Sequence, residues 1–265
     1  MRIVHLSDAH ISREGKPYLP GVDLGARCRT AVRVSGALQP GADLVVLGGD
    51  MLDDGPSPDY RTLAGVLEGL VAPVHLCLGN HDSLEDFRLA PLPTFPKGCG
   101  GYYSFDAGGF RLIILFTAAE RRGKGSVDRA QMEWLRSELD TARNALIFMH
   151  HPPVDVGIQW LDSIKVGNPS EFWEIVEPFA GRIAGIFFAH VHMQLSLVHK
   201  GILLASPPAA GWQFRADPAA GRAETSDELP GFNVIDTWVE DPSREANPGD
   251  EQPRALSVRT VRFRP

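Results

Sequence analysis

The sequence predicts a layered α/β sandwich in which helices cover mixed β-sheets. Short apolar runs bounded by turn residues recur along the chain, helical periodicity separates several early runs, and the later runs follow one another closely. The chain has 265 residues, 43% of them hydrophobic and 22% charged, which is enough to bury one continuous core. We therefore expect a single domain over residues 1–265.

Nine apolar runs are predicted to form strands, because each is short and ends at turn residues. They cover residues 3–6, 44–47, 74–78, 111–116, 145–149, 183–188, 202–205, 232–239 and 255–263. Residues 1–210 are expected to form the core of the domain, and 231–264 its C-terminal strands. The stretch 241–254 is rich in Pro, Glu, Asp and Asn, which predicts an exposed loop between the last two strands.

Two segments, residues 131–140 and 170–179, have the period of amphipathic helices. Their apolar stripes are Met132, Leu135 and Leu139 in the first, and Phe172, Ile175, Val176 and Phe179 in the second. Ser170 is the expected N-cap of the second helix, and Gly181 is expected to end it. Phe172 and its neighbour Trp173 are expected to be core residues rather than a platform for stacking a base.

The composition excludes several classes of protein. The net charge is −7, and Lys and Arg are scattered, so binding to a nucleic acid polymer is not expected. Three widely spaced cysteines indicate neither a thiolate zinc site nor a disulfide framework. No apolar stretch is long enough to span a membrane, and the N-terminal one is too short for a signal peptide. The expected compartment is the cytoplasm.

Metal-binding residue types follow five of the predicted strands. In chain order they are Asp8 and His10, then Asp50, then Asn80, then His150, then His190 and His192. Ligands of α/β sheets bind at the carboxyl ends of strands, so we expect these side chains to converge. Glycines at 48, 49 and 79 allow the backbone to turn sharply beside the expected centre.

Imidazoles, carboxylates and one amide oxygen form a ligand set for Fe, Mn, Zn or Co. Seven candidates are too many for one tetrahedral ion and suit two divalent or mixed-valence ions, with Asp50 as the shared carboxylate. Two divalent cations with Asp8 and Asp50 leave a cavity of net charge +2, which favours a hydroxide and an anionic ester. The sequence thus predicts hydrolysis of a phosphate ester by a hydroxide held between two metals.

Two residues beside the amide ligand Asn80 are predicted to be catalytic. His81 is expected to stabilise the transition state or to protonate the leaving group. Asp82 is expected to orient the His81 imidazole.

Other polar residues near these motifs are given structural roles. His151 is expected to pack or form hydrogen bonds beside the site rather than to bind a metal. His5 and His75 lie in or beside predicted strands and are expected to be core or edge histidines. Asp53 is expected to cap the following helix, which is a commoner use than contact with the site.

The chain resembles the calcineurin-like metallophosphoesterases over about residues 1–210. The resemblance rests on five sequence blocks that stand in the order typical of that family: D-x-H, G-D, G-N-H-D, H-H-P-P and H-V-H. Within that superfamily the chain is similar to the bacterial class III cyclic nucleotide phosphodiesterases and glycerophosphodiesterases. The segments that carry this similarity are Gly125 with Gln131-x-x-Trp134-Leu135, Ser206-Pro207 with Gln213-Phe214, and Pro230-Gly231.

The resemblance implies a four-layer αββα sandwich of two mixed sheets flanked by helices. It implies one metal bound by Asp8, His10, Asp50 and His192, and a second bound by Asp50, Asn80, His150 and His190. It also implies that His81 is the catalytic histidine. Ala189 stands where the family usually has glycine, and alanine can replace glycine wherever φ is negative.

The expected function is hydrolysis of a small phosphodiester, with a 3′,5′-cyclic nucleotide of the cAMP type as the best single substrate. The same ligands would serve a glycerophosphodiesterase, a phosphomonoesterase or a nucleotide pyrophosphatase. A metal-binding scaffold without activity and a repair-type nuclease are further alternatives, which the intact ligand set and the acidic charge oppose. The expected binding partner is thus a small anionic phosphoester substrate. Related enzymes often dimerise, so the resemblance also allows a homodimer.

Overall fold

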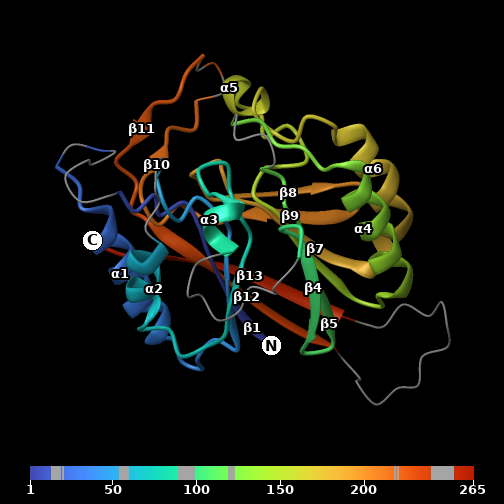
Figure 1. Ribbon diagram of the computed structural model, residues 1–265, viewed down its shortest axis with the longest axis horizontal. Helices are drawn as coiled ribbons and strands as arrows, with labels where there is room; N and C mark the ends of the chain where they lie inside the picture. Colours follow the sequence, from blue (N-terminus) through green and yellow to red (C-terminus); the bar gives the residue numbers. More distant parts are fainter. Residues whose placement is uncertain are drawn as a thin grey trace.

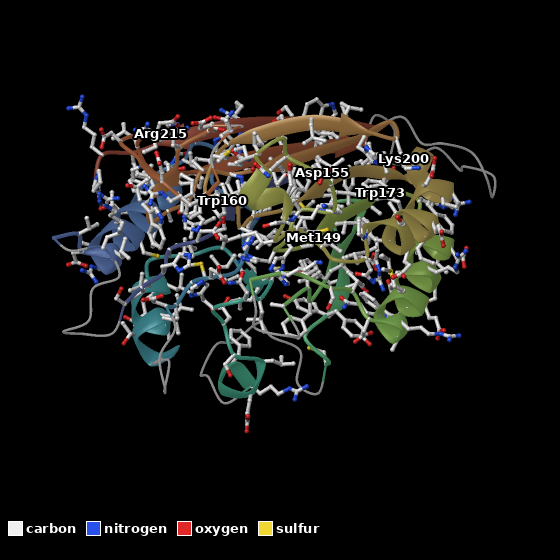
Figure 2. The ribbon with its side chains drawn as sticks, turned by 90° about the horizontal axis from the view of Figure 1, so that it is seen from above. Met149, Asp155, Trp160, Trp173, Lys200 and Arg215 are labelled. Atoms are coloured by element: carbon white, nitrogen blue, oxygen red, sulfur yellow. The ribbon has the colours of Figure 1, made fainter. Side chains whose placement is uncertain are left out.

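In the computed structural model, two β-sheets pack face to face and helices cover their outer sides (Figure 1). The structure describes residues 1–12, 19, 21–53, 60–88, 99–118, 123–217, 219, 221–239 and 254–265. Seen from above, α1 and α2 lie on one side of the molecule and α4 and α6 on the other (Figure 2). The predicted four-layer αββα arrangement is therefore confirmed.

The first sheet has five strands in the order β13-β12-β1-β2-β3. Their bounds are β1 Arg2–Leu6, β2 Leu44–Leu47, β3 Val74–Leu76, β12 Gly231–Val239 and β13 Arg254–Arg262. β1, β2 and β3 are parallel, whereas β12 runs antiparallel to β1 and pairs with β13 over its whole length. The C-terminal strands thus complete the sheet that the N-terminal strand begins.

The second sheet has six strands in the order β4-β5-β6-β7-β9-β8. Their bounds are β4 Tyr103–Ala107, β5 Phe110–Ile114, β6 Ala145–Phe148, β7 Ile183–Phe187, β8 Leu195–His199 and β9 Ile202–Ser206. β5, β6, β7 and β9 are parallel, and the edge strands β4 and β8 are antiparallel. A small separate hairpin consists of β10 Gln213–Phe214 and β11 Thr225–Ser226.

Alternation along the strands divides the core into layers, because successive side chains of a strand point to opposite faces. In β1, Ile3 belongs to the cluster between the sheets, whereas Val4 and Leu6 face the helices. In β2, Val46 points between the sheets and Val45 toward the helices. Buried parallel strands therefore carry almost continuous apolar sequence, which is why they were predictable.

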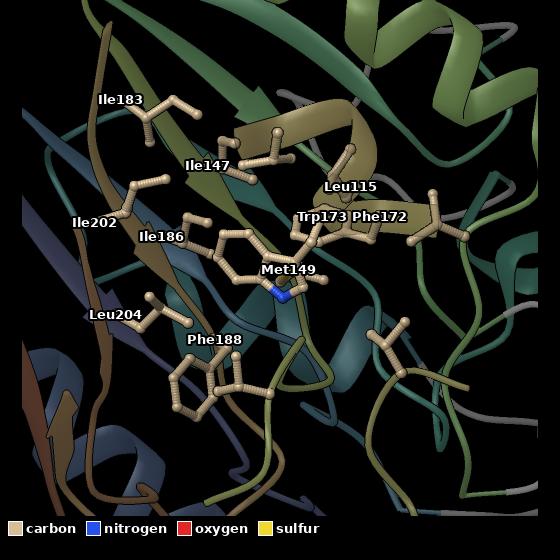
Figure 3. Packing of buried hydrophobic residues seen from close by; sticks show 14 of the residues in the cluster. Leu115, Ile147, Met149, Phe172, Trp173, Ile183, Ile186, Phe188, Ile202 and Leu204 are labelled. Carbon is tan, nitrogen blue, oxygen red and sulfur yellow. The ribbon is translucent and has the colours of Figure 1, made fainter. Parts of the chain in front are cut away.

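Helices close the two outer faces. α1 Leu24–Gly36 and α2 Tyr60–Leu67 cover the first sheet, and α4 Arg129–Thr141 and α6 Pro169–Val176 cover the second. Figure 3 shows part of the second outer core, where Phe172 and Trp173 of α6 pack against Ile147 and Ile186 of the sheet. Both aromatic residues are core residues, as predicted. The short helices α3 Leu84–Arg88 and α5 Gln159–Asp162 lie in loops.

All nine predicted strands are present, with bounds that differ by at most two residues. The edge strands β4 and β8 and the hairpin β10–β11 were not predicted, because their partly exposed sequences lack a continuous apolar run. Residues 241–253 of the loop predicted at 241–254 lie outside the described residues, and Arg254, its last residue, belongs to β13 instead. No described helix has the length and apolar character needed to cross a membrane.

The helix predicted at 170–179 is present, but both of its predicted ends are wrong. Asn168 is the N-cap and Pro169 takes the first helical position, where its missing amide hydrogen costs no hydrogen bond. The α-helix ends at Val176 rather than near Gly181, and a 3₁₀ turn, η1 Glu177–Arg182, follows. Pro178 accounts for this change, because proline cannot donate the next helical hydrogen bond.

Candidate metal centre

The structure brings all seven predicted metal ligands together at the carboxyl ends of parallel strands from both sheets. Asp8 and His10 follow β1, Asp50 follows β2, Asn80 follows β3, His150 follows β6, and His190 and His192 follow β7. Every one of these side chains is buried. Ligand atoms within 4.8 Å of one another define four overlapping groups among the described residues. They are Asp8 with His10 and His192, Asp8 with Asp50 and His150, His150 with His151 and His190, and His10 with Asp53 and His81.

The first cluster contains Asp8, His10 and His192. The Nε2 atoms of His10 and His192 are 3.1 Å apart, and His192 Nε2 lies 3.5 Å from Asp8 Oδ1. Asp50 adjoins this cluster, with its Oδ2 atom 3.8 Å from His10 Nε2. These four side chains can surround one cation.

The second cluster surrounds His150. Its Nε2 atom lies 3.2 Å from Asp50 Oδ2, 3.2 Å from Asn80 Oδ1 and 3.2 Å from His190 Nδ1. Asp50 Oδ2 is therefore the atom that adjoins both clusters. The other oxygen of this carboxylate, Oδ1, accepts a hydrogen bond from the backbone amide of His81 at 2.8 Å.

Hydrogen bonds behind the two clusters fix where the imidazole lone pairs point. His150 Nδ1 lies 2.8 Å from the carbonyl oxygen of Gly48, and His192 Nδ1 lies 2.9 Å from that of Trp212. A carbonyl oxygen only accepts, so each Nδ1 carries a hydrogen, and in the neutral imidazole each Nε2 directs its lone pair into the site. Asp8 Oδ1, also in the site, has no hydrogen-bond partner among the described residues. Such converging acceptors fit two cations well.

The pKa values of the buried groups report the same negative potential. Burial opposes charge on His150, but the neighbouring Asp50 carboxylate outweighs it and raises the pKa of His150 to about 9. Burial also raises the pKa of Asp50, but His150 and the other imidazoles hold it well below its ordinary value. For His10 and His190, burial lowers the pKa well below the ordinary value, so these imidazoles are neutral and can donate a lone pair to a metal ion. The Asp50 carboxylate thus favours positive charge at His150, the position where a bound cation would also be stabilised.

The backbone of the site is strained where the ligands are. Six non-glycine residues among the described ones have a positive φ, and five of them are predicted ligands: Asp8, His10, Asp50, His190 and His192. The left-handed region is unfavourable for residues with a side chain and is found mainly at functional sites. Ala189 is not among these residues, so its methyl group is tolerated beside His190.

His81 lies at the partly exposed rim of the centre, where its ring packs edge-on against that of His10 at 4.7 Å. Asp53 Oδ1 lies 3.5 Å from His81 Nδ1. Contact with the site, the alternative to helix capping for Asp53, is therefore present, and the segment that leads into the following helix lies outside the described residues. The place of Asp53 three residues after Asp50, on the loop that leaves β2, was the only sequence signal for this contact.

Asp82 has a different role from the predicted one. Its Oδ2 atom accepts hydrogen bonds from the backbone amides of Asp50 and Gly79, at 2.7 and 2.9 Å. Burial, together with the charge of Asp50, raises the pKa of Asp82 to about 7. Asp82 therefore ties the loops after β2 and β3 together, and among the described residues it is the Asp53 carboxylate that adjoins His81.

His5, His75 and His151 make contacts outside the two clusters, and His151 also lies within ligand distance of His150 and His190. His151 Nδ1 lies 2.8 Å from Thr117 Oγ1, and its Nε2 lies 3.1 Å from the carbonyl oxygen of Gly123. His75 stacks on Phe105 at 3.7 Å. His5 is fully buried between the sheets, where burial lowers its pKa to about 3.

A fold of this kind, with two cation-binding clusters that share a carboxylate, defines a metal-dependent phosphoesterase. A sequence model of the family Calcineurin-like phosphoesterase matches residues 1–194. The chain belongs to this family and is a metal-dependent phosphoric ester hydrolase.

Relatives of known description agree with this assignment. The chain is 32% identical to a probable cyclic nucleotide phosphodiesterase of Rhodopseudomonas palustris, over 76% of this chain and 75% of that protein. It is 28% identical to the 3′,5′-cyclic adenosine monophosphate phosphodiesterase CpdA of Pseudomonas aeruginosa, over 88% and 84%. It is 29% identical to the glycerophosphodiester phosphodiesterase GpdQ of Enterobacter lignolyticus, over 79% and 77%.

Solved structures share the fold at low identity. A dimetal phosphatase from Danio rerio matches with a TM-score of 0.64 and 14% identity, over 99% of each chain. A purple acid phosphatase from yellow lupin matches with a TM-score of 0.61 and 13% identity, over 88% of this chain and 48% of that one.

Proposed function

We propose that this chain hydrolyses a small phosphodiester, with 3′,5′-cyclic nucleotides as its substrates, at a centre of two metal ions. The observation that carries the proposal is the convergence of lone pairs on two points beside Asp50 Oδ2. We assign Asp8, His10, Asp50 and His192 to one ion, and Asp50, Asn80, His150 and His190 to the other. The mixed donor set suits Fe, Mn or Zn.

When bound, two such ions lower the pKa of water to about 7 and hold both the attacking and the leaving oxygen. The residues around them have separate tasks. Asp50 neutralises part of both charges, and the Gly48 and Trp212 carbonyls keep His150 and His192 in the tautomer that presents Nε2. His81 donates a proton to the leaving oxygen from Nε2, because Asp53 adjoins its Nδ1.

The relatives support the diester and cyclic nucleotide parts of this proposal. One of those named above is described as a probable cyclic nucleotide phosphodiesterase, and another as a 3′,5′-cyclic adenosine monophosphate phosphodiesterase. The similarity to a glycerophosphodiester phosphodiesterase favours one second candidate, a diester with a polyol group.

A substrate panel tests the proposal. Purified protein would be assayed for metals by elemental analysis and for hydrolysis of cyclic AMP, glycerophosphoethanolamine, bis(p-nitrophenyl) phosphate and p-nitrophenyl phosphate. We expect two metals per chain and the highest kcat/KM for cyclic AMP. A higher kcat/KM for the monoester would contradict a phosphodiesterase, and a higher value for glycerophosphoethanolamine would favour the second candidate.

A further inference from the structure

Three aromatic side chains extend from the metal centre toward the surface of the molecule. Trp212 packs on the rings of His10 and His192, each at 4.6 Å. Phe214 also packs on His192, at 4.5 Å, and Trp160 of α5 meets Phe214 at 4.9 Å. The rings thus form a continuous row that starts at two ligands of the first cluster and ends on α5.

The outer two rings pack against the outer core of the second sheet and are partly exposed, whereas the inner one is buried. Trp212 is buried, and Phe214 and Trp160 are only partly buried. The planes of Trp160 and Phe214 are nearly perpendicular, at 89°. In the view from above, Trp160 lies between Arg215, which follows β10, and Met149, which precedes His150 (Figure 2). Two rings at a right angle form an apolar corner beside the centre.

Backbone hydrogen bonds fix this corner relative to the ligands. His192 Nδ1 bonds the carbonyl oxygen of Trp212, and the amide of Phe214 donates to the carbonyl oxygen of His192 at 3.0 Å. Gln213 points away from both rings and bonds the backbone of Ala209. Phe214 is therefore held in a set position beside one metal ligand.

We propose that Trp160 and Phe214 form the subsite for the planar base of a nucleotide whose phosphate lies at the metal centre. This inference rests on the proposed function and goes further, because it assigns the residues that distinguish a nucleotide from other phosphodiesters. A base can stack on one ring and meet the edge or face of the other, which are the favoured geometries of aromatic pairs. The polyol group of a glycerophosphodiester has no ring and gains much less from such a corner.

Competitive inhibition tests the subsite without requiring that cyclic AMP is a substrate. Hydrolysis of bis(p-nitrophenyl) phosphate would be inhibited by AMP and by ribose 5-phosphate, which share the ribose and the phosphate and differ in the base. We expect the wild-type protein to bind AMP at least about tenfold more tightly, which is the usual contribution of base stacking on an aromatic ring. This preference should disappear in Trp160→Leu and in Phe214→Leu, and in Trp160→Leu the inhibition constant for ribose 5-phosphate should stay unchanged.

Trp238→Leu is the matched control. Trp238 is also a partly exposed tryptophan, but it lies on β12 beyond the residue that pairs with Arg2, at the end of the sheet opposite the centre. It should keep the wild-type preference for AMP. Trp160→Leu is the decisive variant, because Trp160 packs on Phe214 rather than on a ligand.

The outcomes separate this inference from the proposed function. A wild-type protein without preference for AMP, or a preference that survives in both leucine variants, would overturn the subsite. A preference lost in both variants, in a protein that does not hydrolyse cyclic AMP, would support the subsite and overturn the proposed substrate.

Discussion

Strain and electrostatics at single residues distinguish the metal centre from the rest of the chain. A left-handed conformation costs a residue such as Asp50 or His190 roughly 1–3 kcal/mol, and the surrounding hydrogen bonds must offset it. The ligand types could be predicted from the sequence, because their chemistry is a property of the residue. The roles of Asp53 and Asp82 could not, because they depend on which loop each carboxylate meets.

His81→Ala tests the assigned proton donor. We expect kcat for cyclic AMP to fall by roughly 10²–10⁴, the usual contribution of general acid catalysis. The loss should be much smaller for bis(p-nitrophenyl) phosphate, whose leaving group needs no proton. Metal content measured by elemental analysis should stay at the wild-type value, and His75→Ala is the matched control. An equal loss for both substrates would contradict proton donation by His81.

His5→Leu tests the cost of a buried imidazole. The pKa of His5 in the folded protein is about 3, against an ordinary value near 6.5, so the unfolded chain binds the extra proton below pH 6.5. Wild-type stability should therefore fall as the pH drops from 6.5 toward 3, by up to about 1.4 kcal/mol per pH unit from this residue. Leucine has no titratable group, so the His5→Leu protein should lack this pH-dependent loss of stability. Denaturation at pH 7.5 and 5.5 should show an advantage for His5→Leu that grows at the lower pH; a constant difference would refute the interpretation.

At the scale of elements, each ligand sits where a buried parallel strand gives way to a turn. Strands were predictable because burial on both faces requires an apolar run. The ends of α6 were not, because Asn168 and Pro169 compete with Ser170 for the helix start. The turns themselves depend on glycines that allow close approach of two loops.

Gly49→Ala tests one of these turns. Gly49 has a φ of +100°, and a Cβ there would lie 2.6 Å from Gly79 N and 2.6 Å from His150 Nδ1. We expect a loss of roughly 2–5 kcal/mol in the free energy of unfolding, from strain and overpacking together, and a metal content below two per chain.

Gly65→Ala is the control for this turn. Gly65 lies in α2 with no atom within 4 Å of the added Cβ. Alanine there should stabilise the protein by about 0.5–1 kcal/mol, since it is the better helix former. Equal effects of the two substitutions on unfolding would contradict a special role for the turn at Gly49.

At the scale of the whole molecule, the metal centre joins the two sheets. Asp8, His10 and Asp50 come from loops of the first sheet, and His150, His190 and His192 come from loops of the second. Cations bound here would cross-link the two halves of the sandwich. The halves separate on unfolding, so the unfolded chain would no longer contain the site.

Metal removal tests this coupling. Metal in 100-fold excess over its Kd should stabilise the native state by about 2.7 kcal/mol, which raises Tm by roughly 5–10 °C for a chain of this size. A chelator should reverse the shift, and Asp50→Asn should abolish it because the carboxylate shared by both clusters is lost. A Tm that is independent of metal in the wild-type protein would contradict the proposed centre.

The sequence by itself determined nine of the eleven strands of the two sheets, the order of the ligand blocks and the chemistry that those ligands favour, because each depends on local residue types and their period. Only the tertiary structure decided that Asp50 Oδ2 adjoins both clusters, that Asp53 rather than Asp82 adjoins His81, and that Trp160 meets Phe214. These contacts join residues distant in the chain. They follow from how two sheets pack and how strained loops leave them, which no local pattern encodes.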